Sequence, residues 1–288
     1  MAEFIVIQTL HGLVYSMLLF ILALGLSMTF GMLGFVNLAH GSFFLLGAYV
    51  GLSAFGASGS FILAVLAGAL AAGVVGYLLE RLWLQGFYRR TALDQVVLSF
   101  GFALVFIDVG KMIWGKDIHS LVAPPPFQGA INIVGTTFPT YRLLLIVIGS
   151  MLFLATWFGI ERTRIGALIR AAVADRDMVR GLGYDVRPLF ASVFALGALL
   201  AGLGGVLAAP ITSVYPGLDF EVLITTLIVV VVGGLGNIVG AFWASLLIGV
   251  SDTFGRALAP QFASFLIFAV MALVLLARSL GHAEEDVG

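Results

Sequence analysis

The chain has 288 residues, of which 61% are hydrophobic and only 10% are charged, with 14 basic and 15 acidic side chains. A soluble domain of this length carries about 25% charged residues, so the composition predicts a polytopic membrane protein. The near-zero net charge argues against nucleic acid as a partner, and the absence of cysteine excludes disulfides, thiol catalysis and zinc–thiolate sites. The first residues lack the basic region of a signal peptide and open a long apolar run, so we expect a retained first helix.

Apolar runs of about 20 residues predict membrane helices. The well-marked runs cover residues 4–31, 41–56, 61–79, 95–114, 141–160 and 188–209. Three shorter runs follow, at residues 222–234, 238–255 and 262–277. The count is nine if every run crosses the membrane and eight if one of the short runs is re-entrant. We therefore expect an all-α polytopic membrane protein with eight or nine transmembrane or re-entrant helices in one domain, residues 1–288.

The charges of the loops predict the orientation. The 115–140 loop has one lysine, a run of three prolines at Pro124, Pro125 and Pro126, and a Thr/Ile/Val-rich stretch that predicts a small hairpin, and we place it outside the cell. The 211–221 loop has no basic residue and is also expected outside. The polar turn with Arg81, Arg89 and Arg90 is expected in the cytoplasm. Nine crossings then leave the N-terminus outside and the tail, residues 281–288, in the cytoplasm.

Residues 161–187 form the only long hydrophilic segment of the chain. Six arginines lie in this segment: Arg162, Arg164, Arg170, Arg176, Arg180 and Arg187. Arginine costs about 2.5–3.5 kcal/mol at the centre of a membrane helix, so burying all six would cost on the order of 15 kcal/mol. The segment is therefore predicted to be a cytoplasmic loop.

Apolar residues at helical spacing in this loop predict a pair of short helices. Thr163 is expected to cap the first helix, and Asp175 the second, which would end at Gly181 or Gly183. The loop is either a solvated connector or a docking surface for a cytoplasmic partner.

Two glycine-containing interruptions resemble each other. Phe30-Gly31-Met32-Leu33-Gly34 precedes Asn37 and His40-Gly41, and Val232-Gly233-Gly234-Leu235-Gly236-Asn237 precedes Gly240. Gly-interrupted segments in two halves of a membrane protein indicate discontinuous helices at a transport pathway, which we expect near the midplane. The candidate pathway residues are Gly34, Asn37, His40, Gly41, Gly234, Gly236 and Asn237. Close helix packing through small residues is the alternative, and both explanations can hold together.

Few ionisable residues lie within the predicted spans. Asp108 and Lys111 are three residues apart and are expected to form an ion pair, and Asp252 is expected to reach the membrane interface. An ion-coupled secondary transporter would need a carboxylate such as Asp108 or Asp252. Against this reading, no acid is expected beside either glycine break. A passive channel is the other alternative, but it would leave the arginine-rich loop without a role.

The sequence offers no motif for enzymatic chemistry. His40 with Ser42 has no GxSxG context, and the chain contains neither HExxH nor the phosphate-binding GxxxxGK[ST]. We therefore expect no catalytic residue, no metal site and no cofactor in this chain.

Three ordered segments carry a family resemblance. Residues 30–50, FGMLGFVNLAHGSFFLLGAYV, are similar to the opening motif of the membrane-spanning permease subunits of branched-chain amino acid ABC importers. AGLGGVLAAPITSVYPGLDF and VVGGLGNIVGAFWASLLIGV resemble the next two motifs of these permeases. In the arginine-rich loop the matching positions are Thr163, Gly166, Arg170, Ala171, Ala174, Asp175, Met178, Leu182 and Gly183. The chain is most similar to the first of the two permease types in these systems, which lacks the longer tail of the second.

The resemblance implies a transport subunit of the bacterial cytoplasmic (inner) membrane. It implies pairing with a second, related permease, two cytoplasmic ATPase subunits that bind ATP and Mg, and an extracytoplasmic solute-binding protein. The residues expected to couple to the ATPases are Thr163, Arg164, Gly166, Arg170, Ala171, Asp175, Met178 and Gly183. The solute would be a branched-chain or other amino acid, with urea or short amides as the alternative. The family often has an acid at position 42, so Ser42 argues against a direct acidic contact with the solute there.

Overall fold

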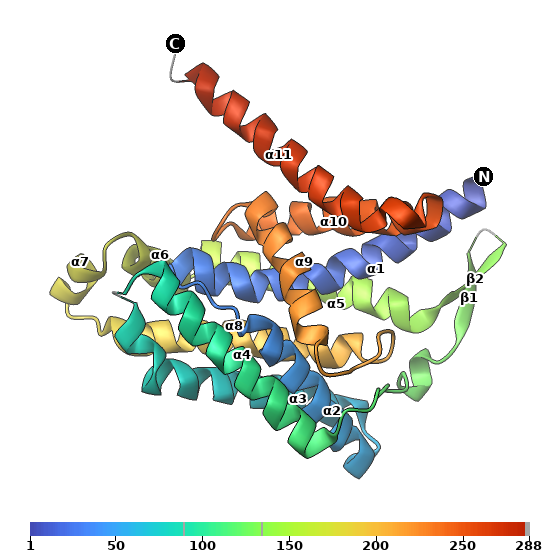
Figure 1. The fold of residues 1–288 in the computed structure, drawn as a ribbon, viewed down its shortest axis with the longest axis horizontal. Helices are drawn as coiled ribbons and strands as arrows, with labels where there is room; N and C mark the ends of the chain where they lie inside the picture. The colour runs from blue at the N-terminus through green and yellow to red at the C-terminus, as the bar shows by residue number, and fades with distance from the viewer. Residues whose placement is uncertain (89, 134, 286–288) are drawn as a thin grey trace.

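The computed structural model describes residues 1–88, 90–133 and 135–285. In this part of the chain there are eleven α-helices and one two-stranded hairpin (Figure 1). The helices are α1 Ala2–Ser27, α2 His40–Ser58, α3 Phe61–Leu82, α4 Ala92–Trp114, α5 Thr140–Arg162, α6 Arg164–Ala174, α7 Arg176–Gly181, α8 Val186–Ala208, α9 Leu218–Gly233, α10 Ile238–Leu258 and α11 Ala263–Glu285. Each predicted apolar run corresponds to one of these helices, so the all-α prediction is confirmed. Arg89, predicted in a cytoplasmic turn, and residues 286–288 of the predicted tail lie outside the described residues.

Seven helices in the described ranges are long and apolar enough to cross a membrane: α1 with its continuation to Gly31, α2, α3, α4, α5, α8 and α10. The expected eight or nine spanning or re-entrant segments also included α9 and α11. α9 has 16 residues and a length of about 24 Å, which is less than the ~30 Å thickness of a bilayer core. The chain is a multi-pass membrane protein in which α9 crosses the neighbouring helices at a steep angle (Figure 1).

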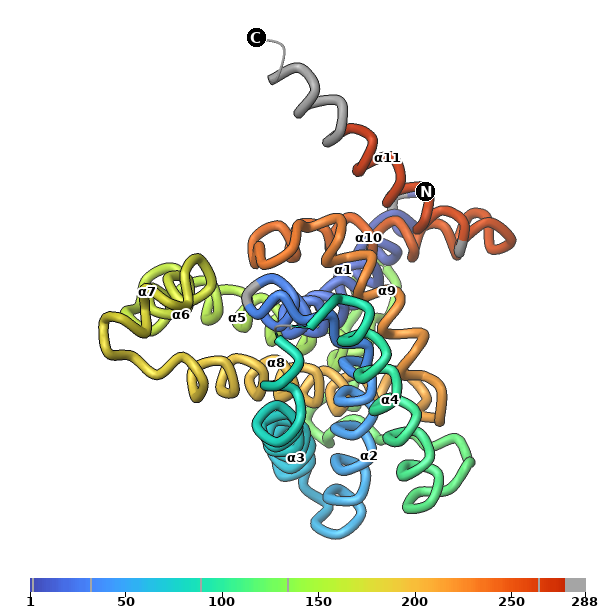
Figure 2. Tube along the Cα trace, turned by 60° about the vertical axis from the view of Figure 1, so that its left-hand side comes forward, coloured from blue at the N-terminus to red at the C-terminus, as the bar shows by residue number. Residues whose placement is uncertain are grey.

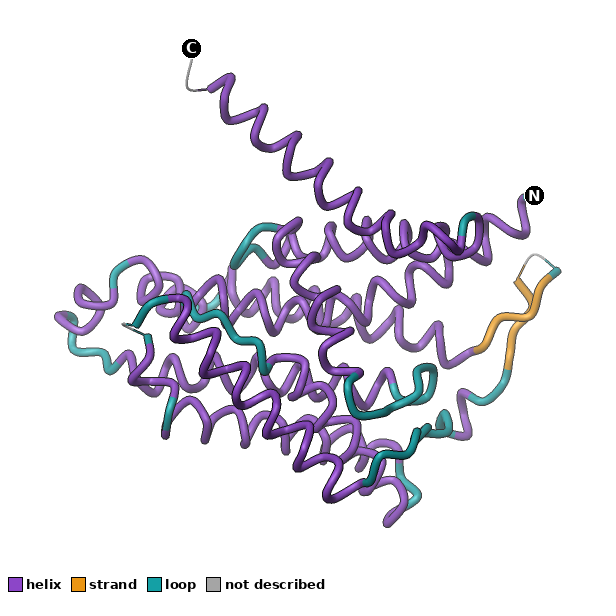
Figure 3. Tube along the Cα trace, viewed as in Figure 1, coloured by secondary structure: helices purple, strands orange, loops and turns teal. Residues whose placement is uncertain are grey.

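The long helices run between two ends of the molecule. One end carries α6 and α7, which project from the body between α5 and α8 (Figure 2); we call it the arginine-rich end. The opposite end carries the start of α1 and an antiparallel hairpin of β1 (Ala130–Ile133) and β2 (Thr136–Pro139) (Figure 3). We call it the hairpin end. The predicted hairpin in the 115–140 loop is therefore confirmed.

Small residues let the helix backbones approach closely. A Cβ atom on Gly47 of α2 would collide with the backbone of Gly202 on α8, and a Cβ on Gly68 of α3 would collide with the carbonyl of Gly47. On the other side of the bundle, Phe20 of α1, Phe153 of α5 and Phe242 of α10 pack with ring centroids 4.1–5.8 Å apart. Close glycine contacts are how helices associate where burial from water provides no driving force.

Candidate coupling surface and buried polar centre

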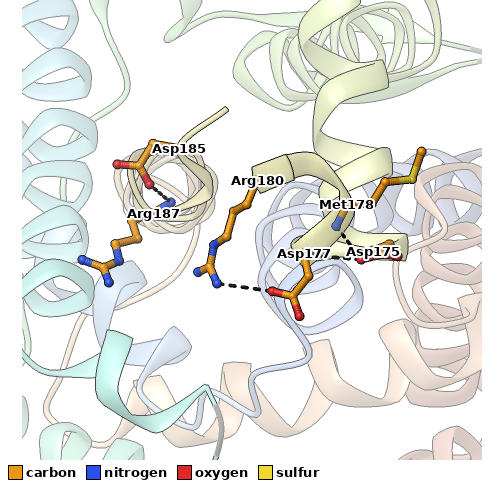
Figure 4. A network of polar contacts seen from close by, with 6 residues as sticks. All are labelled: Asp175, Asp177, Met178, Arg180, Asp185 and Arg187. Atoms are coloured by element: carbon orange, nitrogen blue, oxygen red, sulfur yellow. Dashed lines mark hydrogen bonds and ion pairs between the residues drawn. The ribbon is translucent and has the colours of Figure 1, made fainter. Parts of the chain in front are cut away.

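The two short helices of the arginine-rich loop form with the predicted caps. The Thr163 hydroxyl accepts a hydrogen bond from the Gly166 amide at 3.1 Å and so begins α6. The Asp175 carboxylate accepts from the amides of Asp177 and Met178 at 3.0 and 2.9 Å and begins α7 (Figure 4). These bonds satisfy amides that a helix start leaves without partners. The loop is therefore a structured element.

The apolar residues of α6 and α7 divide between two environments. Ile169 and Ala172 are buried against this chain. Gly166 is buried as well, and a Cβ there would collide with the backbone carbonyl of Ile160 at the end of α5. Gly166 thus serves the close approach of α6 to α5.

A second apolar set on these helices remains uncovered. Ile165 is 68% exposed, Met178 is 64% exposed, and Leu182, directly after α7, is 66% exposed. Isolated apolar side chains are common on surfaces, but three of them on one otherwise hydrophilic element make that element a candidate contact surface for a partner. We call Ile165, Met178 and Leu182 the exposed apolar set.

Arginines tie the loop to the body of the molecule. Arg170 donates a hydrogen bond to the Ile160 carbonyl and lies 3.7 Å from Glu161. Arg176 donates to the Leu33 carbonyl at 2.9 Å, directly beside the first glycine break. Motion of α6 and α7 would therefore be transmitted to the end of α5 and to the first glycine break.

Arg176 also borders a polar cavity of about 490 Å³ at the arginine-rich end, lined in part by Arg180 and Arg187. Its guanidinium stacks on the ring of Phe190, with 4.5 Å between its central carbon and the ring centroid. Arg180 pairs with Asp177 at 3.5 Å, and its side chain and that of Arg187 extend into the same space (Figure 4).

Tyr88 lines the same cavity and donates a hydrogen bond to Glu80 at 3.0 Å. Burial, and after it the negative charge of Glu80, raise the pKa of Tyr88, so the phenol stays protonated and remains a donor.

The two glycine breaks meet in space. A Cβ on Gly31 would collide with the backbone of Gly236, so the chain approaches itself here as only two glycines allow. Gly236 has a φ of +77°, a conformation that favours glycine. A cavity of about 380 Å³ beside this contact is lined by Gly31, Gly236 and Asn237 together with Glu161 and Arg170. The contact therefore lies at the arginine-rich end, and the expectation that both breaks sit near the midplane is wrong for this part of them.

The first break continues from this contact into the molecule. α1 ends in a π-helical turn, Met28–Met32, and the chain is then unwound as far as the start of α2. Side chains of α4 satisfy the unwound backbone: the Val36 amide donates to Gln95 at 3.2 Å and the Leu38 amide donates to Ser99 at 3.0 Å. Unwound chain at membrane depth is tolerated because protein covers it.

The two candidate asparagines share a local task. Asn37 is buried, and its side-chain oxygen accepts from the Ala39 amide at 3.0 Å just before α2. Asn237 is exposed, and its oxygen accepts from the Gly240 amide at 2.8 Å at the start of α10. Asn237 therefore caps α10, whereas Asn37 closes a local turn before α2, whose N-cap residue Ala39 has no side-chain cap.

His40 lies deeper than the glycine contact. It is buried, and its Nε2 forms a 3.1 Å hydrogen bond with the Leu22 carbonyl in the middle of α1. The His40 Nδ1 and the Asn37 amide nitrogen are buried and have no hydrogen-bond partner among the described residues. These atoms are the unsatisfied polar groups of the first break, together with the nearby carboxylate described next.

Asp219, at the start of α9, is the residue that the sequence interpretation missed. The Ser42 hydroxyl donates to its carboxylate at 3.1 Å, both side chains are buried, and Gly41 packs against the Asp219 backbone. The statement that no acid stands beside a glycine break is thus wrong, because Asp219 is 177 positions away in sequence but adjacent in space. The available signal was an aspartate in the PGLDF motif at a helix start, where the helix dipole favours an anion.

Asp108 and Asp252, the two candidate coupling carboxylates, are both paired. Lys111 lies 3.2 Å from Asp108, as predicted, with the two side chains 36% and 69% exposed. Asp252 forms a 2.7 Å ion pair with Arg256, and its side chain is only 3% exposed. Asp252 is thus buried beside Arg256 one turn later, and its expected position at the membrane interface stays a prediction.

The family match and two similar relatives point to the same protein family. The family described as "Branched-chain amino acid transport system / permease component" matches residues 8–275. The high-affinity branched-chain amino acid transport system permease protein BraD of Pseudomonas aeruginosa is 28% identical over 290 residues, covering 95% of this chain and 94% of the relative. The corresponding protein LivH of Escherichia coli is 25% identical over 292 residues, with coverages of 95% and 94%. No solved structure matches the chain.

A second permease type provides a contrast. LivM of Escherichia coli is 27% identical over 293 residues, but the match covers 92% of this chain and only 68% of that longer relative. In length the chain therefore agrees with BraD and LivH. Because the family match spans almost the whole chain, including the arginine-rich loop, the glycine breaks and the buried polar centre, the chain belongs to the branched-chain amino acid transport permease family, on the LivH-like side.

Proposed function

We propose that this chain is the permease subunit of an ATP-driven importer of branched-chain or other amino acids. It works in the bacterial cytoplasmic membrane beside a second, related permease. Two ATPase subunits bind ATP and Mg at the arginine-rich end, and a solute-binding protein delivers the solute at the hairpin end. The names of BraD and LivH support the solute class, and the exposed apolar set on a structured cationic loop carries the ATPase part of the proposal.

Coupling follows from the contacts of the loop. The predicted coupling residues lie on α6 and α7 or within two residues of their ends, and Arg170 and Arg176 connect those helices to α5 and to the first break. An ATPase that moves α6 and α7 would therefore pull on the contact between Gly31 and Gly236. We propose that this contact closes the cytoplasmic side of the pathway and separates when the loop moves.

The test is ATP-dependent uptake by the complete complex in proteoliposomes. Leucine uptake should require ATP hydrolysis and the binding protein, and it should persist when a proton or sodium gradient is collapsed. Uptake that follows an ion gradient and not ATP would overturn the proposal in favour of a secondary transporter. Uptake of urea in place of leucine would retain the importer but replace its solute.

A further inference from the structure

A cavity of about 340 Å³ opens at the hairpin end and reaches deep into this chain. It lies between α1, α2, α5, α8, α9 and α10, and one stripe of α1 forms its long wall: His11, Val14, Tyr15, Leu18, Leu19 and Leu22. These positions follow the i, i+3, i+4, i+7 pattern of a single helix face. From His11 to Leu22 the wall extends about 16 Å at 1.5 Å per residue.

The rim of the cavity carries charges of both signs. Arg142 from the start of α5 and Arg256 from the end of α10 supply guanidinium groups, and Glu221 from the first turn of α9 supplies a carboxylate. Arg142 donates one hydrogen bond to His11 at 2.5 Å, and Arg256 uses its Nε for Asp252. The remaining guanidinium nitrogens can therefore act as donors to an anion.

Below the rim the cavity is apolar. Leu18, Leu19 and Leu22 of α1 face Phe44 of α2 and Val222 of α9 across it. The floor adjoins the first glycine break, because the Leu22 carbonyl accepts the hydrogen bond of His40. The part of α1 at Leu22 therefore separates the cavity from the first glycine break.

We propose that this cavity is a binding site within this chain for a zwitterionic amino acid with an apolar side chain. Arg142 and Arg256 hold the α-carboxylate, Glu221 holds the α-ammonium group, and the leucine-lined depth takes the side chain. A volume of about 340 Å³ falls at the lower end of the range of small-molecule sites, roughly 300–1,000 Å³. This inference takes its solute class from the proposed function. Its new element is the location of the solute site in this cavity.

The test uses the absence of cysteine from the chain. In the assembled complex, Val222→Cys places a thiol on the cavity wall, and Ile224→Cys places one on the same helix outside the cavity. A small water-soluble thiol reagent should label Val222→Cys from the hairpin side. Saturating leucine should slow this labelling at least fivefold and should leave Ile224→Cys unaffected.

Analogues and charge variants separate the contacts. Leucinamide lacks the carboxylate, 4-methylvalerate lacks the ammonium group and glycine lacks the side chain, so each should protect Val222→Cys at least tenfold less well than leucine. Arg142→Gln should raise the leucine concentration for half protection about tenfold, with partial rescue by Arg142→Lys. Lys116→Gln removes a charge from the exposed 115–119 loop outside the cavity and should change nothing.

The labelling requires no ATP, so it tests the cavity separately from transport. A complex that imports leucine with ATP but shows no leucine protection of Val222→Cys would overturn the cavity site and leave the importer intact. Protection by leucine without ATP-driven uptake would retain the site and overturn the importer. Equal protection by leucine and 4-methylvalerate would overturn the role of Glu221.

Discussion

At the scale of single residues, the glycines of the two breaks are important because they let two backbone segments approach closely. Gly31 and Gly236 bring two distant segments into backbone contact, whereas Asn237 caps α10 and Asn37 closes a local turn before α2. The pattern of Gly and Asn that predicts a pathway therefore contains two separate physical roles. One is close approach, and the other is a local hydrogen bond from a backbone amide to the asparagine side chain.

Gly31→Ala is expected to lower stability by about 1–3 kcal/mol, because the added methyl group collides with the backbone of Gly236 and the segments must shift. Gly101→Ala in α4 meets open space and should be neutral or stabilising by up to ~1 kcal/mol. Thermal unfolding of both variants in the same detergent measures the difference. Equal melting temperatures would show that the contact tolerates a side chain.

The Asp108–Lys111 pair is expected to be structural. Each side chain is partly exposed on α4, where the bilayer or a partner covers it, so a single neutral substitution strands a charge in an apolar setting. Asp108→Asn with Lys111→Met should therefore give more folded protein than either single variant, as measured by size-exclusion yield. Loss of uptake in Asp108→Asn alone, with normal yield and a harmless Lys111→Met, would instead indicate an ion-coupling carboxylate.

At the scale of elements, the apolar residues of α6 and α7 have two roles, packing against this chain and contact with a partner. The inner part, with Gly166, Ile169 and Ala172, fixes the pair to the end of α5, and the exposed apolar set remains for a partner. Substitution of Gly166 would therefore disturb the position of α6 itself and could not isolate the docking contact.

Ile165→Asp is expected to abolish co-purification with the ATPase subunits without loss of insertion, because Ile165 is 68% exposed and contributes little to this chain's own packing. Ile118→Asp is the matched control, since Ile118 is 72% exposed in the loop near the hairpin end. Affinity purification of the tagged permease with its ATPases measures both. Normal ATPase recovery with Ile165→Asp would show that the exposed apolar set is not the docking surface.

At the scale of the whole molecule, local patterns were predictable from the sequence and distant contacts were not. The apolar runs, the caps at Thr163 and Asp175 and the hairpin depend on neighbouring residues, so spacing alone indicates them. The meeting of Gly31 with Gly236, the pairing of Ser42 with Asp219 and the cavity depend on segments more than 170 positions apart. No periodicity encodes such contacts, because they arise only when the helices pack.

The pathway makes a prediction for cysteine accessibility over the whole chain. Asn237→Cys is exposed and should react with a small hydrophilic thiol reagent, whereas Asn37→Cys and His40→Cys are buried and should react only in another state of the complex. Trapping ATP in the partner should change the rates at these two positions. Leu66→Cys and Phe268→Cys, half exposed on helices expected to face lipid, should stay inert. Identical rates with and without trapped ATP at all five positions would show that the breaks only serve packing.

The burial of Ser42 against Asp219 has a consequence for how relatives of this protein can vary. One enclosed space holds one carboxylate, and a second would meet it as a like charge in a low dielectric. We therefore expect positions 42 and 219 to covary among relatives. Those with an acid at position 42 should carry a neutral residue at position 219, and those with an acid at position 219 should carry a neutral residue at position 42. Ser42→Asp combined with Asp219→Ser should accordingly retain uptake that Ser42→Asp alone loses. A substitution at one of the two positions would then be tolerated or deleterious depending on the residue at the other, although the two codons lie far apart in the gene.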